Sequence, residues 1–397
     1  MTPEKKNVAL LCASQALLFT NNTILITVNG LAGFALAAPD SKAMATLPVT
    51  AYVVGAAMTT LPMSQLMRRV GRVNGFSIGT LIGIFGALLC GYAVYAQAFW
   101  LLVLGTLIMG IYNASGQYYR FAAADVASPD FKSKAISLVM AGGIAGGILG
   151  PQTSRWTKDL LSTEFVATYW VLIGFCLLAL ILQRMMTIPR LTAEEQKQSG
   201  RPIREIARQP AFLVAVMSAT IGYGVMNLLM TATPLAMRSC QHSFGDTAFV
   251  IQWHVVSMFA PSFVTGNLIK RFGVRPILFT GVLLSLGCVA IALSGVDVLH
   301  FWAALVLIGI GWNFMYIGGT TLLTETHTPA EKAKVQGVND MAVFCTMAVS
   351  SASSGWLFSA KGWEMMNYAA IPFLVLTGMA ILWLKTAPKI TLPKRSA

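Results

Sequence analysis

The chain has few charged residues for its length. Only 11% of its 397 residues are Asp, Glu, Lys or Arg, whereas a typical soluble domain has about 25%. A soluble fold of this size needs a charged surface, so the composition excludes a soluble enzyme. The hydrophobic fraction of 56% also excludes a disordered chain. The sequence therefore predicts an all-α polytopic membrane protein whose surroundings are a lipid bilayer.

Residue patterns that carry catalysis or hold a cofactor are missing as well. The six cysteines lie far apart without a Cys-x-x-Cys pair, so they predict buried small side chains rather than disulfides or a metal site. The chain has no Gly-x-x-x-x-Gly-Lys sequence to bind the phosphates of ATP. Scattered Ser and Thr residues form no recognisable nucleophile–base set. We therefore expect no enzyme, no cofactor and no bound metal.

Long apolar runs separated by turn residues are abundant instead. A bilayer core needs about 20 apolar residues per helix. Marking the runs predicts twelve spans, at residues 8–37, 44–66, 74–95, 99–122, 134–154, 166–187, 210–237, 247–269, 274–295, 300–323, 333–358 and 364–385. The first run is too long for a signal-peptide core, so we interpret it as a membrane helix.

Basic residues give the predicted orientation. Of 28 Lys and Arg, 22 fall on one side of the predicted membrane and five on the other, and Arg120 lies within a span. Cytoplasmic loops carry the excess of basic residues, so both termini are expected in the cytoplasm. This rule accounts for the net charge of +13 without a nucleic-acid partner. We expect a multi-pass protein of a bacterial inner (plasma) membrane.

The sequence contains an internal repeat of about 200 residues. The segment Arg68 to Arg72 corresponds to Lys270 to Arg275, and Ser128 to Lys134 corresponds to Thr328 to Lys334. A hydrophilic stretch from 189 to 209 separates the two copies. The predicted domains are an N-terminal six-helix bundle at 1–188, a cytoplasmic linker at 189–209 and a C-terminal six-helix bundle at 210–397. Repeated six-helix units are typical of secondary transporters.

With these features the chain resembles the major facilitator superfamily over nearly its whole length. That family carries a G-x-x-x-D-R-x-G-R loop after its second helix. Arg69, Gly71 and Arg72 match this loop, and Gly266 and Gly273 match in the second copy together with Arg271. The resemblance implies twelve helices in two pseudo-symmetric bundles, alternating access to a site at the midplane, and a monomer.

The match departs from the family at the Asp of this loop, which latches the two halves in the family. Basic residues stand at that position in both copies, as Arg68 and Lys270. Asp125 and Glu325 end the fourth and tenth spans, 200 residues apart. We predict two symmetric cytoplasmic ion pairs, Arg69 with Asp125 and Arg271 with Glu325. The alternative is solvated loop charges, worth at most about 1 kcal/mol.

Polar residues inside the spans are candidates for solute binding. Asn113, Gln117 and Arg120 share one helical face, because their spacing is i, i+4, i+7. The resemblance places this helix against the transport cavity, where Arg120 would hold an anionic or carbonyl group. The alternative is that Arg120 reaches the cytoplasmic surface. The predicted solute-binding residues are Asn22, Asn113, Gln117, Arg120, Asn227, Gln252, Trp312, Asn313 and Tyr316.

Several of these residues have structural alternatives. Amides such as Asn22 and Asn227 can join helices rather than bind solute, and Trp312 can be aromatic core. The centres of the predicted spans contain no carboxylate, so the candidates for proton coupling are Asp340, about two turns into its span, and His254. Asp340 can equally be an interfacial acid, and His254 a hydrogen-bonded structural residue.

Glycines of the fifth span predict close helix contacts. Gly142, Gly143, Gly146, Gly147 and Gly150 form a small-residue surface. With Pro151 this surface resembles part of an antiporter signature of the family. Drug–proton antiporters also carry an Arg midway along the fourth helix, where this chain has Gly105. That departure counts against drug efflux.

The sequence therefore predicts a secondary transporter for a small organic solute that contains a ring or is anionic. The resemblance to the family implies coupling to protons, and facilitated diffusion is the alternative. The stretch Gln117 to Asp125 is similar to a bacterial subgroup that includes proposed riboflavin transporters. One alternative is an efflux antiporter for toxic compounds. Another is a receptor or assembly factor that uses the same fold without transport.

Overall fold

A computed structural model describes residues 2–37, 44, 47–189 and 200–384, and in this part of the chain every regular element is a helix. The chain divides into two compact units. Unit 1 comprises residues 1–128 and 142–192, and unit 2 comprises 129–141 and 193–397.

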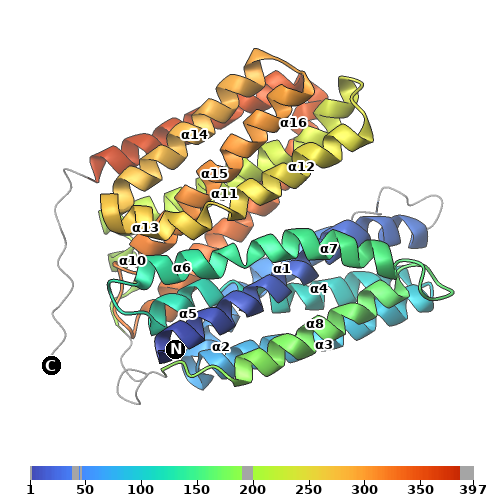
Figure 1. Cartoon of the computed structure of the whole chain (residues 1–397), viewed down its shortest axis with the longest axis horizontal. Coiled ribbons are helices and arrows are strands. Elements are labelled where there is room, and N and C mark those ends of the chain that lie inside the picture. The colour runs from blue at the N-terminus through green and yellow to red at the C-terminus, as the bar shows by residue number, and fades with distance from the viewer. Residues whose placement is uncertain (1, 38–43, 45–46, 190–199, 385–397) are drawn as a thin grey trace. The chain divides into compact units, whose positions relative to one another are not determined.

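Unit 1 is a bundle of helices that run along its length (Figure 1). Its helices are α1 (Pro3–Leu36), α2 (Leu47–Val70), α3 (Arg72–Tyr95), α4 (Phe99–Gly116), α5 (Tyr119–Val126), α7 (Gly143–Thr157) and α8 (Val166–Arg184). Those of unit 2 are α6 (Lys132–Ala141), α10 (Ile203–Ile206), α11 (Pro210–Ser239), α12 (Phe244–Phe259), α13 (Ser262–Phe272), α14 (Val274–Ser294), α15 (Val298–Leu323) and α16 (Lys332–Trp383).

Each of the twelve predicted spans coincides with a helix or with a broken helix. Within the described residues, ten helices are long and apolar enough to cross a membrane, and the bent pair α12 and α13 makes an eleventh. The predicted span 333–358 is the first part of α16. Gly362 separates it from the last span, because its φ of 77° interrupts the helix. The prediction of an all-α polytopic fold is confirmed.

Two turn glycines show the internal repeat in the backbone itself. Gly71 precedes α3 with φ 87° and ψ 160°, and Gly273 precedes α14 with φ 87° and ψ 161°. This conformation is open to glycine and costly for other residues. The same turn therefore links the second span to the third and the eighth to the ninth, as the 202-residue repeat predicts.

The fifth span is divided between the two units at Ala141 and Gly142. Its first part, α6, packs on α13 of unit 2 so closely that a Cβ on Gly266 would lie 2.5 Å from the Cα of Lys134. The Ser137 hydroxyl accepts a 3.0 Å hydrogen bond from the Gly266 N–H and donates to the Ser262 carbonyl. The Ser137 hydroxyl thus stands between the Gly266 N–H and the Ser262 carbonyl, which would otherwise bond to each other within α13. The predicted domain boundaries did not anticipate this grouping, whereas the division near residue 192 falls inside the predicted linker.

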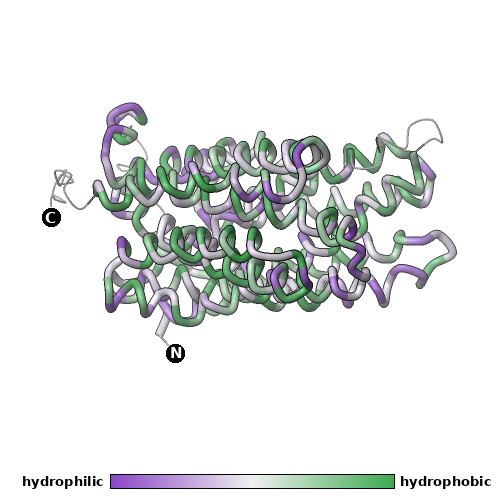
Figure 2. The backbone as a smooth tube through the Cα atoms, turned by 90° about the horizontal axis from the view of Figure 1, so that it is seen from above, coloured by the Kyte–Doolittle hydropathy of each residue, from purple (hydrophilic) through white to green (hydrophobic). Residues whose placement is uncertain are grey.

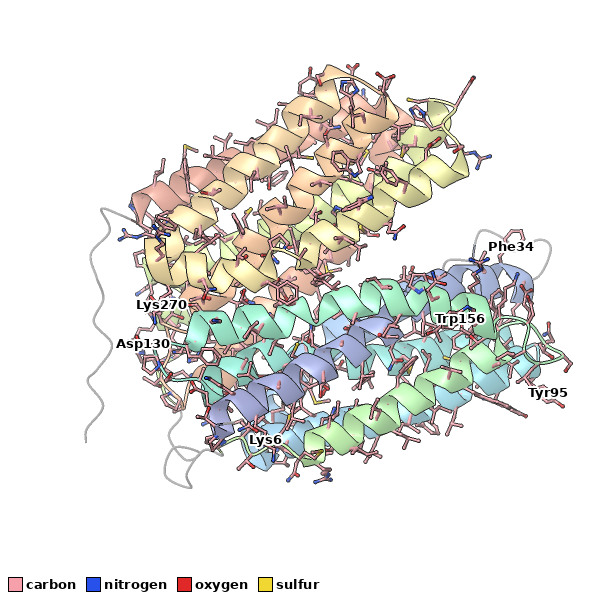
Figure 3. The ribbon with its side chains drawn as sticks, in the orientation of Figure 1. Lys6, Phe34, Tyr95, Asp130, Trp156 and Lys270 are labelled. Carbon is pink, nitrogen blue, oxygen red and sulfur yellow. The ribbon has the colours of Figure 1, made fainter. Side chains whose placement is uncertain are left out.

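Hydrophilic residues gather mainly at the helix ends and in the connections (Figure 2). In unit 1, Lys6 lies at one end of the bundle, and Phe34, Tyr95 and Trp156 lie at the other (Figure 3). Of these three aromatic residues, Tyr95 and Trp156 are 64% and 69% exposed, as expected of Tyr and Trp side chains at a membrane–water interface. In unit 2, Asp130 and Lys270 lie at the same end of the unit (Figure 3).

The second part of the fifth span, α7, makes the close contact that its glycines predict. A Cβ on Gly146 would lie 2.5 Å from the Phe19 Cβ and 2.7 Å from the Thr20 backbone nitrogen of α1. A Cβ on Gly150 would lie 2.6 Å from the Thr23 Cβ. The backbones of α1 and α7 can approach only because these positions have no side chain.

We predict that Gly146→Ala lowers the thermal midpoint of the purified protein by roughly 5 °C, because the added methyl group meets backbone atoms that cannot move aside. The control is Gly174→Ala on α8, where an added Cβ meets nothing within 4 Å. Unfolding of both variants is followed in one detergent. Equal midpoints would contradict the tight contact.

Candidate functional site

A break in the fourth span positions the predicted polar face. The helix α4 ends at Gly116, the residues Gln117 and Tyr118 form a turn, and α5 begins at Tyr119. Arg120 Nη1 donates to the Gln117 carbonyl oxygen at 2.9 Å and to its side-chain Oε1 at 3.3 Å. The turn therefore holds the Gln117 side chain between the two helices.

Four side chains extend this contact across three spans. The Gln117 Nε2 donates to Asn113 Oδ1 at 3.1 Å, and Asn22 Nδ2 of α1 donates to the same oxygen at 3.0 Å. The Tyr52 hydroxyl of α2 then donates to Asn22 Oδ1. We call Tyr52, Asn22, Asn113, Gln117 and Arg120 the amide network. The structure thus joins all four solute-binding residues that were predicted in this half of the chain.

Tyr52 was missed in the sequence, because a single tyrosine in an apolar span carries no periodic signal. A second group that sequence reasoning missed joins Gln183 of α8 to its neighbours. Gln183 Nε2 donates to the Tyr119 hydroxyl at 2.7 Å and to Thr80 Oγ1 at 2.8 Å. The Tyr118 hydroxyl donates to the Thr60 carbonyl oxygen at 2.8 Å. These tyrosines fasten the α5 side of the break to three other helices.

Arg120 is buried inside the unit rather than extended to the surface. Only 1% of the residue is exposed, and its guanidinium carbon lies 4.4 Å from the centroid of the Phe121 ring. Gln117 is the partly exposed member of the network, whereas Asn22 and Asn113 are 8% and 6% exposed. The snorkelling alternative for Arg120 therefore does not describe this structure.

The predicted cytoplasmic ion pair of the first half forms with a different arginine. Asp125 Oδ2 lies 3.1 Å from Nε of Arg72, and Arg69 is exposed. Arg72 is the first residue of α3, directly after the turn at Gly71, and its guanidinium also lies 5.5 Å from the Tyr118 ring centroid. The turn directs Arg72 toward α5, while Arg69 stands in the last turn of α2.

The corresponding pair in the second half is not formed in the described part of the chain. Arg271 is exposed and lies over the Phe272 ring at 5.1 Å. The charged group that acts on Glu325 is Lys132 of α6. The predicted symmetry of the two ion pairs is therefore wrong in this structure, although the residues themselves repeat.

Unit 2 instead contains a buried ion pair that the sequence did not indicate. Arg201, which lies just before α10, places Nη2 2.8 Å from Oε2 of Glu331, and Glu331 is 1% exposed. Burial raises the pKa of Glu331, but hydrogen bonds from Arg201 and from the Thr328 and Arg201 backbone N–H groups outweigh it and lower the pKa to about 2. This pair fastens the end of the linker to the loop before α16.

We predict that Glu331→Gln lowers the thermal midpoint at pH 7, because it removes the ionised partner of Arg201. The pKa of Glu331 is about 2 in the folded protein, below the ordinary value of 4.5 that applies to the unfolded chain. The stabilisation is therefore complete above pH about 4.5 and is lost as the pH falls toward about 2. The difference in thermal midpoint between the wild type and Glu331→Gln should stay constant from pH 7 to 5 and become smaller at pH 4 and 3. A gap that closes between pH 7 and 5 would contradict the lowered pKa.

Four aromatic rings cluster in unit 2. Trp312 stacks on Tyr316 at 5.1 Å between centroids, and Tyr223 of α11 meets the edges of both rings at 5.3 Å. Phe259 of α12 meets Trp312 at 5.7 Å. We call these four residues the aromatic cluster. Tyr223 is its partly exposed member, and Trp312 is 1% exposed behind it.

The indole nitrogen of Trp312 is buried without a hydrogen-bond partner among the described residues. Buried N–H groups are nearly always paired, so this donor is open to an acceptor that the protein does not supply. The cluster therefore combines a stack of flat rings with one unused donor.

Of the other predicted binding residues of unit 2, Asn313 and Asn227 bond to protein partners, and Gln252 lies at the surface. Asn313 accepts from Thr265 at 2.7 Å and donates to Ser262 Oγ and to the Met258 carbonyl, both at 2.6 Å, so it fastens the break between α12 and α13. Asn227 donates to Ser350 Oγ at 2.9 Å and joins α11 to α16. Gln252 is exposed on α12.

Both predicted proton-coupling residues are buried. Asp340 is 2% exposed and accepts a 2.8 Å hydrogen bond from Asn339 Nδ2. His254 is fully buried, and its Nδ1 lies 2.8 Å from the Leu305 carbonyl oxygen. His254 Nε2 has no hydrogen-bond partner in the described residues. The carbonyl contact fixes Nδ1 as the protonated nitrogen and leaves Nε2 as an acceptor.

No group of three or more His, Cys, Asp or Glu in the described residues could hold a metal ion.

Comparison with known proteins gives one family. The sequence profile of the Major Facilitator Superfamily matches residues 11–260 and 216–397. The chain is 40% identical over 391 residues to the riboflavin transporter RfnT of Brucella anthropi, and the match covers 98% of both chains. It is 27% identical over 360 residues to the uncharacterized MFS-type transporter YdeG of Bacillus subtilis, covering 86% of this chain and 84% of that one.

Solved structures agree in fold at low sequence identity. The proton:xylose symporter XylE superposes with a TM-score of 0.78 at 14% identity, over 96% of this chain and 95% of that chain. The human organic anion transporter MFSD10 superposes with a TM-score of 0.77 at 13% identity, over 96% of this chain and all of the other.

Proposed function

Because this chain belongs to the Major Facilitator Superfamily, it is a membrane transporter rather than an enzyme, and we propose that its solute is riboflavin. The observation that carries the proposal is the 40% identity with a riboflavin transporter over 98% of both chains. A similarity of this extent includes both units and all of the candidate site residues. It favours the ring-containing solute among the classes that the sequence predicted.

The aromatic cluster supports a flat solute. Trp312 and Tyr316 are nearly parallel, with an angle of 17° between their planes, and Tyr223 presents a further ring on the partly exposed side. Offset stacking and edge contacts between aromatic rings contribute about 0.5–1.5 kcal/mol beyond the area that they bury. The isoalloxazine ring of riboflavin is flat and large enough to use such a surface.

The amide network supports a solute with carbonyl groups. Three amides and a guanidinium converge in unit 1, and the most exposed of them is Gln117. A few placed polar groups in an otherwise apolar site give orientation and specificity. The carbonyl oxygens and ring nitrogens of a flavin are suitable partners for them.

We further propose that the protein is a monomer in a bacterial inner membrane with both termini in the cytoplasm. The excess of basic residues on one side supports this orientation. In unit 1, Lys6 lies at the end of the bundle opposite Tyr95 and Trp156 (Figure 3), and a basic residue near the N-terminus supports the cytoplasmic side for that end.

We predict that proteoliposomes containing the protein take up radiolabelled riboflavin with saturation, and that Tyr223→Ala raises KM about tenfold, which corresponds to ~1.4 kcal/mol of lost ring contact. Tyr223→Phe keeps the ring and should stay within about threefold of wild type. The control is Tyr92→Ala, which removes an exposed tyrosine of α3. Uptake of cationic drugs in place of riboflavin would contradict the proposed solute and favour efflux.

Proton coupling is part of the proposal, with Asp340 as the carrier. Asp340 is a buried carboxylate on a span of unit 2, and intramembrane acids are common proton carriers in transporters. His254 is the weaker candidate, since its Nδ1 proton is held by a backbone carbonyl.

We predict that a pH gradient, acidic outside, drives riboflavin accumulation in the wild type. Asp340→Asn should abolish this accumulation and preserve exchange of labelled for unlabelled riboflavin, because binding remains while the titratable group is lost. The control is Glu364→Gln, which removes an exposed carboxylate from the part of α16 that follows the break at Gly362. Accumulation by Asp340→Asn at the wild-type level would exclude Asp340 as the carrier.

A further inference from the structure

We propose that Arg120 fixes the direction of every hydrogen bond in the amide network, so that unit 1 presents N–H donors to the solute. Arg120 is on this view a positioning residue that acts through Gln117 and Asn113 and does not itself need to touch the solute. The consequence is selectivity for solutes whose edge carries hydrogen-bond acceptors. The choice of riboflavin as probe rests on the proposed function, whereas the direction of the network does not.

The argument starts from the chemistry of arginine. A guanidinium carries only donors and stays protonated in proteins. The Arg120 Nη1 lies 3.3 Å from the end of the Gln117 side chain. Only the amide oxygen can face that donor, because an amide NH2 group would place two donors against each other. Gln117 is therefore oriented with Oε1 toward Arg120 and Nε2 toward Asn113.

The orientation then passes from one amide to the next. Because Gln117 offers Nε2, Asn113 must offer Oδ1, and the two atoms lie 3.1 Å apart. Asn22 approaches the same oxygen at 3.0 Å and must also offer its Nδ2. That leaves Asn22 Oδ1 to accept from the Tyr52 hydroxyl. A hydroxyl can donate or accept, so Tyr52 adapts to the direction that Arg120 sets.

Among the three amides, the side-chain atom left without any hydrogen bond in the described residues is a donor, Asn113 Nδ2. Asn113 Oδ1 already accepts two hydrogen bonds, and the oxygens of Asn22 and Gln117 each accept one. The hydrogen bonds of the Asn113 side chain in the described part of the chain all end on its Oδ1, so Nδ2 keeps both of its N–H groups. Asn22 Nδ2 and Gln117 Nε2 each retain a second N–H. Gln117 is partly exposed, so its second N–H lies where a solute can reach it.

The direction of the hydrogen bonds in the amide network can be tested without any solute by making the same change, Asn to Asp, at two positions in turn. Asn113→Asp keeps an oxygen where two donors point, so both bonds survive. Asn22→Asp places an oxygen against Asn113 Oδ1 and loses that bond. Both variants introduce the same carboxylate into the same network. We expect the thermal midpoint of Asn22→Asp to lie at least about 5 °C below that of Asn113→Asp. The opposite order, or equal midpoints, would overturn the assigned direction.

The effect on the solute is tested by riboflavin kinetics in proteoliposomes. Asn113→Asp replaces the Nδ2 donor of Asn113 by an acceptor oxygen. Arg120→Leu removes the donor that orients the Gln117 amide, so the amides of the network can turn over. We expect KM to rise about tenfold in both with kcat retained, because the folded transporter remains but its donors are lost. Arg120→Lys supplies another cation that carries only donors and should restore KM to within about threefold.

The matched control is Arg184→Leu. Arg184 Nη1 also donates to an amide oxygen at 3.3 Å, that of Asn74, but outside the network. The Arg184→Leu variant should therefore have the wild-type KM for riboflavin. A wild-type KM for Asn113→Asp, or no rescue by Arg120→Lys, would overturn the proposal. A wild-type protein that does not transport riboflavin would contradict the proposed function, and the comparison of midpoints would still decide the direction of the network.

Discussion

A polar side chain within a bilayer has no water to bond, so it must find its partner inside the protein, and this constraint explains most of the polar contacts in both units. Gln183 of α8 donates from Nε2 to the Tyr119 hydroxyl at 2.7 Å and to Thr80 Oγ1 at 2.8 Å, and its Oε1 lies 3.2 Å from the same Thr80 hydroxyl. Both ends of this amide are bonded within the protein, so no solute is needed to explain it. An amide or hydroxyl in a span is therefore evidence for binding only when a donor or acceptor remains after its protein partners are counted.

The fold was predictable because it depends on features that the sequence displays directly. Span length follows from bilayer thickness, and the repeat appears in loop residues, which the shared φ of 87° at Gly71 and Gly273 confirms. The ion pairs were less predictable, because their geometry depends on the turn between spans. Arg69 and Arg72 stand three residues apart, yet that turn places Arg72 against Asp125 and leaves Arg69 exposed.

Residues at equivalent positions of the repeat need not have equivalent roles. Asn113 and Asn313 stand 200 residues apart on equivalent spans. The neighbours of Asn113 are other amides, so it becomes part of a network with donors to spare. Around Asn313 lie Thr265, Ser262 and a carbonyl freed where α12 meets α13, and both ends of its side chain are bonded to them. The sequence repeat could place both residues at the same depth but could not show these neighbours.

The burial of Arg120 is more informative than its charge. A guanidinium that held an anionic solute directly would need an exposed edge, yet Arg120 is 1% exposed and donates to Gln117. Hydrogen bonds in a chain polarise one another in a medium of low dielectric constant. In the role that we propose for Arg120, its positive charge strengthens the N–H groups of the amides without facing the solute itself. A site of that kind would favour neutral molecules rich in carbonyl groups, as the proposed flavin is, so an intramembrane arginine need not imply an anionic solute.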